Sequence, residues 1–307
     1  MIRKYVPMFV GFVAALSVLV SSHTAQAHEP VFSPGPRTIY EDGVATAMTA
    51  ESSFDGGRDG PIRLSGDVAY GLTSHLQFAL GVPVLVGRQA DHGPSTAVGD
   101  SVFQVKWRAW DHMARRLIDS FSLLTAVKLP TGHHETSIGN TGFTLGAMMA
   151  REHRRYYLFG SALYTTQTAG VGGRRPGDVF QYNLATGIRP FLLEYDQPDA
   201  VVLVGLNGTT TRPAQVVGAA SEKQTLRRGL SEQREYRTVR QANGGGAVDF
   251  GAAGGAAGTE LAVSPQLLFS WGPVMLKGGV QFPFFDTFEA EGATPNFRIK
   301  SSLIVEY

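Results

Sequence analysis

Charged residues in this sequence recur at alternate positions of segments whose remaining positions are mostly apolar. In the segment from Ile62 to Leu72, Arg63 and Asp67 occupy odd positions, while the even positions are apolar except for one glycine. Alternate side chains of a strand point to opposite faces. The same phasing predicts a polar, inward face carrying Arg63, Lys106, Arg108, Lys128, Arg189, Lys277, Arg298 and Lys300 as cations and Asp67, Glu260 and Glu306 as anions.

The chemistry of such a face depends on what it encloses. Lysine and arginine side chains around a water-filled lumen lower the barrier for anions and favour an anion-selective pore. In a lumen nearly filled by side chains, the same charges would instead pair into a stabilising network. The sequence leaves both interpretations open for these pore candidates.

A few histidines are weak candidates for binding a metal ion. His133 and His134 precede Glu135 in a predicted loop, and His28 would combine an imidazole with a free α-amine if it began the mature chain. The alternatives are solvated loop residues and a frayed terminus. Metal binding therefore stays unknown at this stage.

Catalysis, cofactors and nucleic acid find little support in the sequence. The chain has no cysteine, and none of the serines examined lies in a Gly-x-Ser-x-Gly elbow. No glycine-rich turn links a strand to a helix to hold phosphate. Lys and Arg number 27 against 26 Asp and Glu, so no basic excess favours nucleic acid. We predict a protein that is not an enzyme and needs no cofactor.

The elements that must position the charged face are strands. About twelve alternating segments are each close to the 9 to 11 residues that cross a bilayer at a tilt. We place them at 38–51, 61–72, 75–84, 99–110, 117–129, 141–150, 155–166, 178–190, 200–211, 259–270, 273–283 and 297–307. The predicted fold class is all-β, a transmembrane antiparallel β-barrel of about 12 strands.

The connections support the same plan. Those after even-numbered strands are short and those after odd-numbered strands are long or glycine-rich, with the longest at 212–257. A soluble sandwich or lipocalin-like barrel is the alternative, but its core would have to hold half of all strand positions. We therefore expect short periplasmic turns and long extracellular loops.

The N-terminal residues read as an export signal. Arg3 and Lys4 precede an apolar stretch, which ends before Ala25-Gln26-Ala27. This pattern predicts a signal peptide at 1–27 cleaved after Ala27, a short periplasmic segment at 28–37, and a barrel at 38–307 in the bacterial outer membrane.

The expected partners follow from that location. They are outer-membrane lipids and lipopolysaccharide, whose phosphates the basic loop 212–257 could meet. The final alternating strand closes on Tyr307, which resembles the C-terminal signal read by the barrel-assembly machinery. Aromatic residues near the predicted strand ends, such as Trp107 and Trp271, are also consistent with girdles at the two membrane interfaces.

Several motifs spread over the chain carry a family resemblance. They are HEPVFSPGPRTIYEDG, the GD before VFQVKWRAW, AVKLPTG, the LNG after VVLVG, SPQLLFSW and GGVQFPF. In this order they resemble the outer-membrane transporter family associated with the meta-pathway of phenol degradation, itself distantly similar to long-chain fatty acid transporters. The resemblance implies a barrel and passage of small apolar or aromatic solutes.

The functional expectation combines this resemblance with the basic face. It is a passive channel or transporter for small apolar, aromatic or anionic solutes of unknown identity. The alternative is a closed structural or binding barrel whose loops recognise lipopolysaccharide, a metal or a partner protein.

Overall fold

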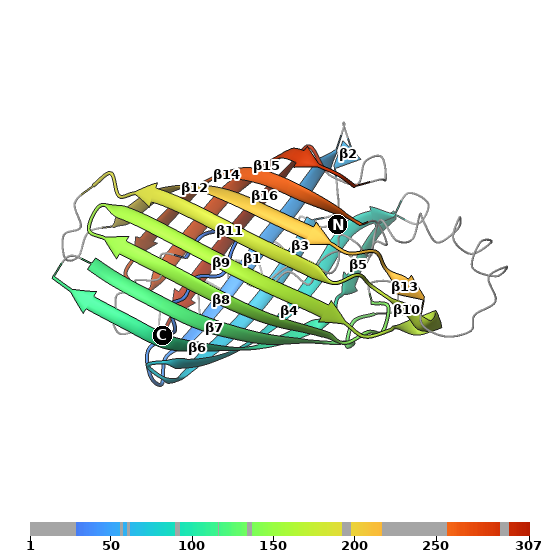
Figure 1. The fold of residues 1–307 in the computed structure, drawn as a ribbon, viewed down its shortest axis with the longest axis horizontal. Coiled ribbons are helices and arrows are strands. Elements are labelled where there is room, and N and C mark those ends of the chain that lie inside the picture. Colours follow the sequence, from blue (N-terminus) through green and yellow to red (C-terminus); the bar gives the residue numbers. More distant parts are fainter. Residues whose placement is uncertain are drawn as a thin grey trace.

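The computed structural model describes residues 29–307, with gaps at 56–57, 60–61, 90–92, 116, 134–136, 192–197, 217–256 and 289–294. Twelve long strands of this part form a closed antiparallel barrel (Figure 1). They are β1 (Val44–Asp55), β3 (Ile62–Thr73), β4 (Leu76–Gln89), β6 (Ser101–Ala114), β7 (Leu117–Leu129), β8 (Gly142–His153), β9 (Tyr156–Gln167), β11 (Val179–Ile188), β12 (Asp199–Thr211), β14 (Gly258–Trp271), β15 (Val274–Asp286) and β16 (Phe297–Glu306). The all-β barrel class expected from the alternating pattern is confirmed.

The barrel closes where its last strand meets its first. Residues Ala45 to Phe54 of β1 pair in register with Glu306 to Phe297 of β16. Beyond them, the amide of Tyr307 donates to the carbonyl of Val44 at 2.7 Å, and the Val44 amide donates back at 3.0 Å. The seam thus pairs the backbone groups that would otherwise form two open sheet edges.

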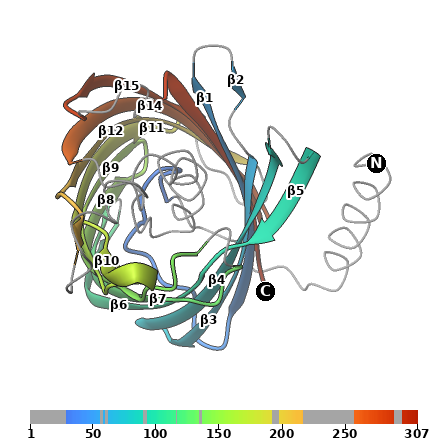
Figure 2. The same ribbon diagram turned by 90° about the vertical axis from the view of Figure 1, so that its right-hand side faces the viewer.

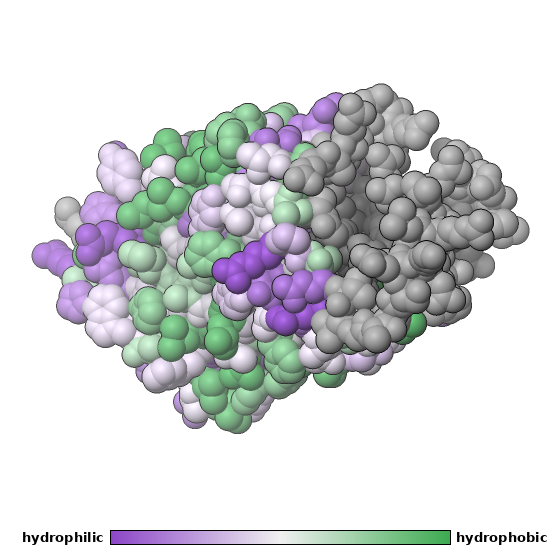
Figure 3. Space-filling view, turned by 45° about the vertical axis from the view of Figure 1, so that its right-hand side comes forward, coloured by the Kyte–Doolittle hydropathy of each residue, from purple (hydrophilic) through white to green (hydrophobic). Residues whose placement is uncertain are grey.

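The outer wall is apolar. Large hydrophobic side chains from every long strand except β1 are exposed there, such as Leu145, Leu184 and Val204, which are 64%, 52% and 50% exposed. Figure 3 shows hydrophobic residues over much of the wall, with hydrophilic ones at the end that carries the short turns and again towards the opposite end. An outer face of this composition is suited to contact with lipid.

The described residues contain no helix that is both long and apolar enough to span a membrane.

Several short strands lie at the end of the barrel opposite the short turns. β5 (Gly93–Val98) pairs with residues Val84–Gln89 of β4, and β2 (Arg58–Asp59) pairs with the end of β1. β10 (Arg174–Arg175), after the 3-10 turn η3 (Val171–Gly173), pairs with β13 (Gln215–Val216). The prediction that β4 ends at 84 is wrong, because the chain continues to Gln89 and returns as β5.

One carboxylate ties the loop before β11 to the wall. Asp178 accepts hydrogen bonds from the hydroxyls of Tyr164 and Thr166 at 2.9 and 2.8 Å, and from Arg175 at 3.3 Å; Arg212 lies 3.9 Å away. Partial burial acts to raise the pKa of Asp178, but these hydrogen bonds and cations together lower it below its usual value. The carboxylate therefore stays ionised and fastens the end of β9 to the start of β11.

The two faces of β6 provide a test of the barrel phasing. Phe103 faces outward with 40% exposure, whereas its neighbour Gln104 faces the lumen opposite Ala79 and Ala126. We expect Phe103→Arg to lower the free energy of unfolding by about 2 to 4 kcal/mol if it lies near the bilayer midplane, because its charge enters hydrocarbon. Gln104→Arg, the matched control, places the same charge in the polar interior and costs less.

Urea unfolding of the protein in lipid vesicles, followed by tryptophan fluorescence, measures both values. Equal costs for the two variants, or a larger cost for Gln104→Arg, contradict the assignment of the faces.

Candidate functional site

The residues before β1 lie inside the barrel. Figure 2, which looks into the ring from the side of the long loops, shows the first described part of the chain within it. We call residues 29–43 the lumen segment. The sequence prediction differs here, since it assigned 28–37 to a short periplasmic segment and began the first strand at 38; the strand begins at Val44. The physical reason is that residues 29–43 find their partners on inward-facing side chains.

Neutral hydrogen bonds hold the lumen segment at the end with short turns. The Thr38 hydroxyl donates to the carbonyl of Ser74 at 2.7 Å, and the amide of Ile39 donates to Gln77 Oε1 at 3.0 Å. The carbonyl of Pro36 accepts a short hydrogen bond from the hydroxyl of Ser122. These contacts reach the β3–β4 turn, β4 and β7, so the segment runs across the barrel.

Two ion pairs add charge to these contacts. Arg37 binds Glu152 of β8 in a bidentate manner, with Nε–Oε1 and Nη2–Oε2 distances of 2.7 and 2.8 Å. Lys106 of β6 donates to Glu29 Oε1 at 2.9 Å and to the carbonyl of Arg37 at 3.0 Å. Both wall partners are buried, which strengthens each pair relative to one in water.

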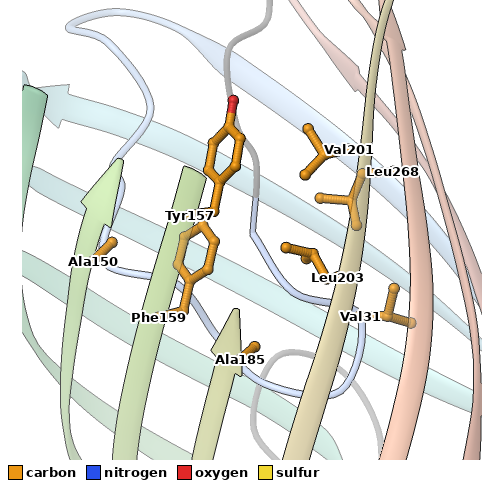
Figure 4. Packing of buried hydrophobic residues seen from close by; sticks show 8 residues of the cluster. All are labelled: Val31, Ala150, Tyr157, Phe159, Ala185, Val201, Leu203 and Leu268. Carbon is orange, nitrogen blue, oxygen red and sulfur yellow. The ribbon is translucent and has the colours of Figure 1, made fainter. Parts of the chain in front are cut away.

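An apolar area of the inner wall receives the other side of the segment. Val31 packs among inward side chains of β8, β9, β11, β12 and β14 (Figure 4), and Phe32 packs against the same group. These wall residues are Ala150, Tyr157, Phe159, Ala185, Val201, Leu203 and Leu268. The alternating pattern did not predict them, because it assigned the inward face to polar residues.

A chain of hydrogen bonds begins at Val31 and crosses four strands, β14, β12, β11 and β9. The amide of Val31 donates to Gln266 Oε1 at 2.6 Å, and Gln266 donates to Ser264 at 3.0 Å. Ser264 donates to Asn207 at 2.6 Å, Asn207 to Asn183 at 2.8 Å, and Asn183 to Ser161 at 3.0 Å. Every donor points the same way, so the segment's backbone amide begins a polarised network that fixes the inner wall.

All eleven predicted pore candidates belong to the inward face or its rim, but many are paired. Arg189 binds Asp199 at 2.7 Å, and Arg298 Nη2 binds Glu260 Oε2 at 2.8 Å. Lys128, only 1% exposed, lies 3.4 Å from Asp100 and donates to Asn140 and Gln167. With Lys106 and Glu29, at least four of the eight cations therefore have a carboxylate partner among the described residues.

Three of those carboxylates were missed by sequence reasoning. Glu29, Asp100 and Asp199 lie before, between or at the ends of strands, where alternation gives no phase. Asp100 also accepts the amide of Gly132 at 3.0 Å and thereby holds the loop after β7. The signal that could have found them is their position next to the predicted strand ends.

The remaining candidates have other surroundings. Arg108 donates to the carbonyl of Ser74, and Asp67 accepts from Ser65 at 3.5 Å with Arg63 and Lys300 in electrostatic range. Lys277 is 7% exposed and forms no hydrogen bond or ion pair within the described part of the chain. Glu29, Glu306, Lys106 and Lys300 act on it electrostatically.

Of the three metal candidates, only His133 belongs to the described residues. His28 and His134 fall outside the described residues, as do the predicted signal peptide 1–27 and most of the loop 212–257. The amide of His133 donates to the Val98 carbonyl at 2.9 Å, which anchors the loop to β5. Among the described residues no group of three histidines or carboxylates could hold a metal ion.

Comparison with solved structures gives the fold. An outer membrane channel from Pseudomonas putida F1 matches with a TM-score of 0.57 and 12% identity, over 90% of this chain and 99% of that one. The beta domain of the Bordetella autotransporter BrkA has a TM-score of 0.42 and 9% identity, over 86% and 99%. LpxR from Salmonella typhimurium has a TM-score of 0.39 and 10% identity, also over 86% and 99%.

No protein-family model matches the sequence, and no curated protein matches it either. The likeness to the Pseudomonas putida channel is therefore a likeness of fold, in which this chain shares the architecture of an outer-membrane β-barrel.

Proposed function

We propose that the protein is a passive outer-membrane channel for small solutes. In the structure described above, residues 29–43 occupy its lumen. Solutes pass when this segment leaves the lumen. The observation that carries the proposal is the way in which the segment is attached.

Residues 29–39 of the segment bond mainly to side chains of the wall, whereas Asp42 and Gly43, next to β1, bond to the backbone of Gly71 in β3 at 2.8 and 2.9 Å. Each long strand already has a partner on both sides, and the ring closes between β1 and β16. The bonds of residues 29–39 include those to Gln77, Lys106, Ser122, Glu152 and Gln266, together with one turn carbonyl. Removing residues 29–37 leaves the backbone ladder of the wall intact, so opening needs no strand to separate.

The lumen that the segment occupies suits solutes with two kinds of surface. Its wall carries Lys106, Lys277 and Lys300, and beside Lys277 it carries the apolar group of Phe159, Leu203 and Leu268. Small anions and small apolar or aromatic molecules are therefore the solute classes we propose.

The wall supports a proposal for location and partners. Its apolar outer face fits the outer membrane, with lipid and lipopolysaccharide around it and Tyr307 presented to the barrel-assembly machinery. Transport requires no bond making, and we propose no enzymatic activity and no cofactor.

Deleting residues 29–37 tests the gating role. We expect the deletion to raise single-channel conductance in planar bilayers severalfold over the parent protein, because the ion pairs and apolar contacts across the lumen disappear while the strands remain. Heat-modifiable gel migration confirms that the deleted protein still forms a barrel. A folded deletion protein that conducts no ions in any salt is the result that contradicts a channel.

Neutralising one cation of the lumen is a second test. In the deletion protein, Lys277→Gln should lower the chloride-to-potassium permeability ratio, because it removes a cation from the path. Arg115→Gln removes a cation from an exposed periplasmic turn and is the matched control. Reversal potentials under a salt gradient measure the ratio, and equal shifts for both variants contradict a path past Lys277.

A further inference from the structure

Glu29 is the only carboxylate that the lumen segment brings to the lysines of the inner wall, within the part described. Lys106, 4% exposed, binds both the Glu29 carboxylate and the Arg37 carbonyl, so it closes residues 29–37 into a loop. The loop is tight, since a Cβ on Gly35 would lie 2.6 Å from Glu29 Cγ. The segment thus holds one anionic group at a defined place in the lumen.

A second cation beside this carboxylate has no direct partner. Lys277 is more than nine-tenths buried and forms neither a hydrogen bond nor an ion pair within the described residues, although Glu29 and Glu306 act on it electrostatically and Lys106 and Lys300 oppose them. A buried ammonium group without a direct partner is costly. The wall therefore carries more positive charge than Glu29 neutralises by contact, which is the arrangement expected of a site for a further anionic group.

An apolar site adjoins the cationic one along the same segment. Two residues after Glu29, Val31 is 5% exposed within the group that includes Phe159 and Leu268, and Phe32 packs against it. Gly279 makes room for the ring, since a Cβ there would lie 2.8 Å from Phe32 Cε2. A carboxylate and an aromatic ring are thus presented to the wall within four residues.

We propose that residues 29–32 are a tethered mimic of the solute, and that the solute is a small carboxylate with an apolar ring or chain. Its carboxylate takes the place of Glu29 between Lys106 and Lys277, and its apolar part takes the place of Val31 and Phe32. The inference rests on the proposed channel function and names both its solute class and its opening signal.

Competition of this kind makes opening depend on the solute. The solute binds only when the segment has left, so it shifts the population towards the open state by its affinity for that state alone. Its apparent dissociation constant equals the intrinsic one divided by the open fraction. Weakening the hold of Glu29 should therefore lower the solute concentration needed for opening.

Thiol labelling reports the position of the segment directly. The chain has no cysteine, so Val31→Cys introduces a single thiol that is buried when the segment is in place. The thiol is labelled with a cationic, membrane-impermeant reagent. We expect benzoate at about ten times its intrinsic Kd for the open state to raise the labelling rate roughly tenfold, because a ligand that binds only one state shifts the equilibrium by 1 + [L]/Kd.

Two further probes separate the halves of the site. Benzyl alcohol keeps the ring without the charge, and acetate keeps the charge without the ring. Each should need a much higher concentration than benzoate to raise labelling. Benzyl alcohol acting as well as benzoate would overturn the role of the lysines, and acetate acting as well would overturn the role of the apolar group.

Two variants in the Val31→Cys background locate the effect. Glu29→Gln should raise labelling without benzoate and shift the benzoate titration to lower concentration, while Lys277→Gln should shift it to higher concentration. Glu41→Gln, an exposed carboxylate of the same segment, is the matched control and should titrate like the parent. The parent titration alone decides the matter if a variant fails to show heat-modifiable migration.

The outcomes distinguish the two proposals. If benzoate leaves labelling unchanged while the 29–37 deletion conducts, the mimic is wrong and the channel stands. If the deletion conducts nothing, the channel itself is wrong whatever benzoate does to the segment.

Discussion

The pairing of backbone polar groups is the constraint on which this structure depends. In a hydrocarbon layer an unpaired amide or carbonyl costs several kcal/mol, so the wall must be complete in itself. The seam between β1 and β16, extended by the mutual bonds of Val44 and Tyr307, meets that demand. Because the backbone groups of the wall are already paired, residues 29–39 attach mainly to inward side chains, and only the last residues before β1 bond to the sheet backbone at Gly71 among the contacts described.

The strands and their phase could be predicted because the period of two is a local property. Phe103 and Gln104 are assigned to opposite faces from neighbours alone, and all inward charges follow in the same way. Contacts across the lumen could not be predicted, since Glu29 meets Lys106 and Arg37 meets Glu152 only after the ring has closed. The lumen segment itself shows no alternation of apolar and polar residues. Its sequence indicates only that it is not a strand, because Pro30, Pro34 and Pro36 lack the backbone N–H that a strand donates to its neighbour.

The inner face turned out to be divided instead of uniformly basic. Alternation predicts which residues point inward but not how inward residues of different strands group around the ring. Tyr157, Phe159 and Leu203 share a parity with polar residues of their own strands, yet together they form an apolar area that borders Lys277 of β15, the register partner of Leu268. Arg189 illustrates the boundary, since its guanidinium pairs with Asp199 and also lies 5.1 Å from the ring centre of Tyr157. The inner wall of the barrel therefore carries an apolar surface and a charged surface next to each other.

The sequence separation of the lumen contacts has a consequence for the order of assembly. Val31 and Gln266 are 235 positions apart, and Arg37 and Glu152 are 115 apart. Closing such long loops is entropically costly until the intervening strands have paired. Docking of the N-terminal residues thus belongs at the end of folding, after a hollow ring exists. The last movement of maturation and the movement that admits a solute would then be one motion run in opposite directions.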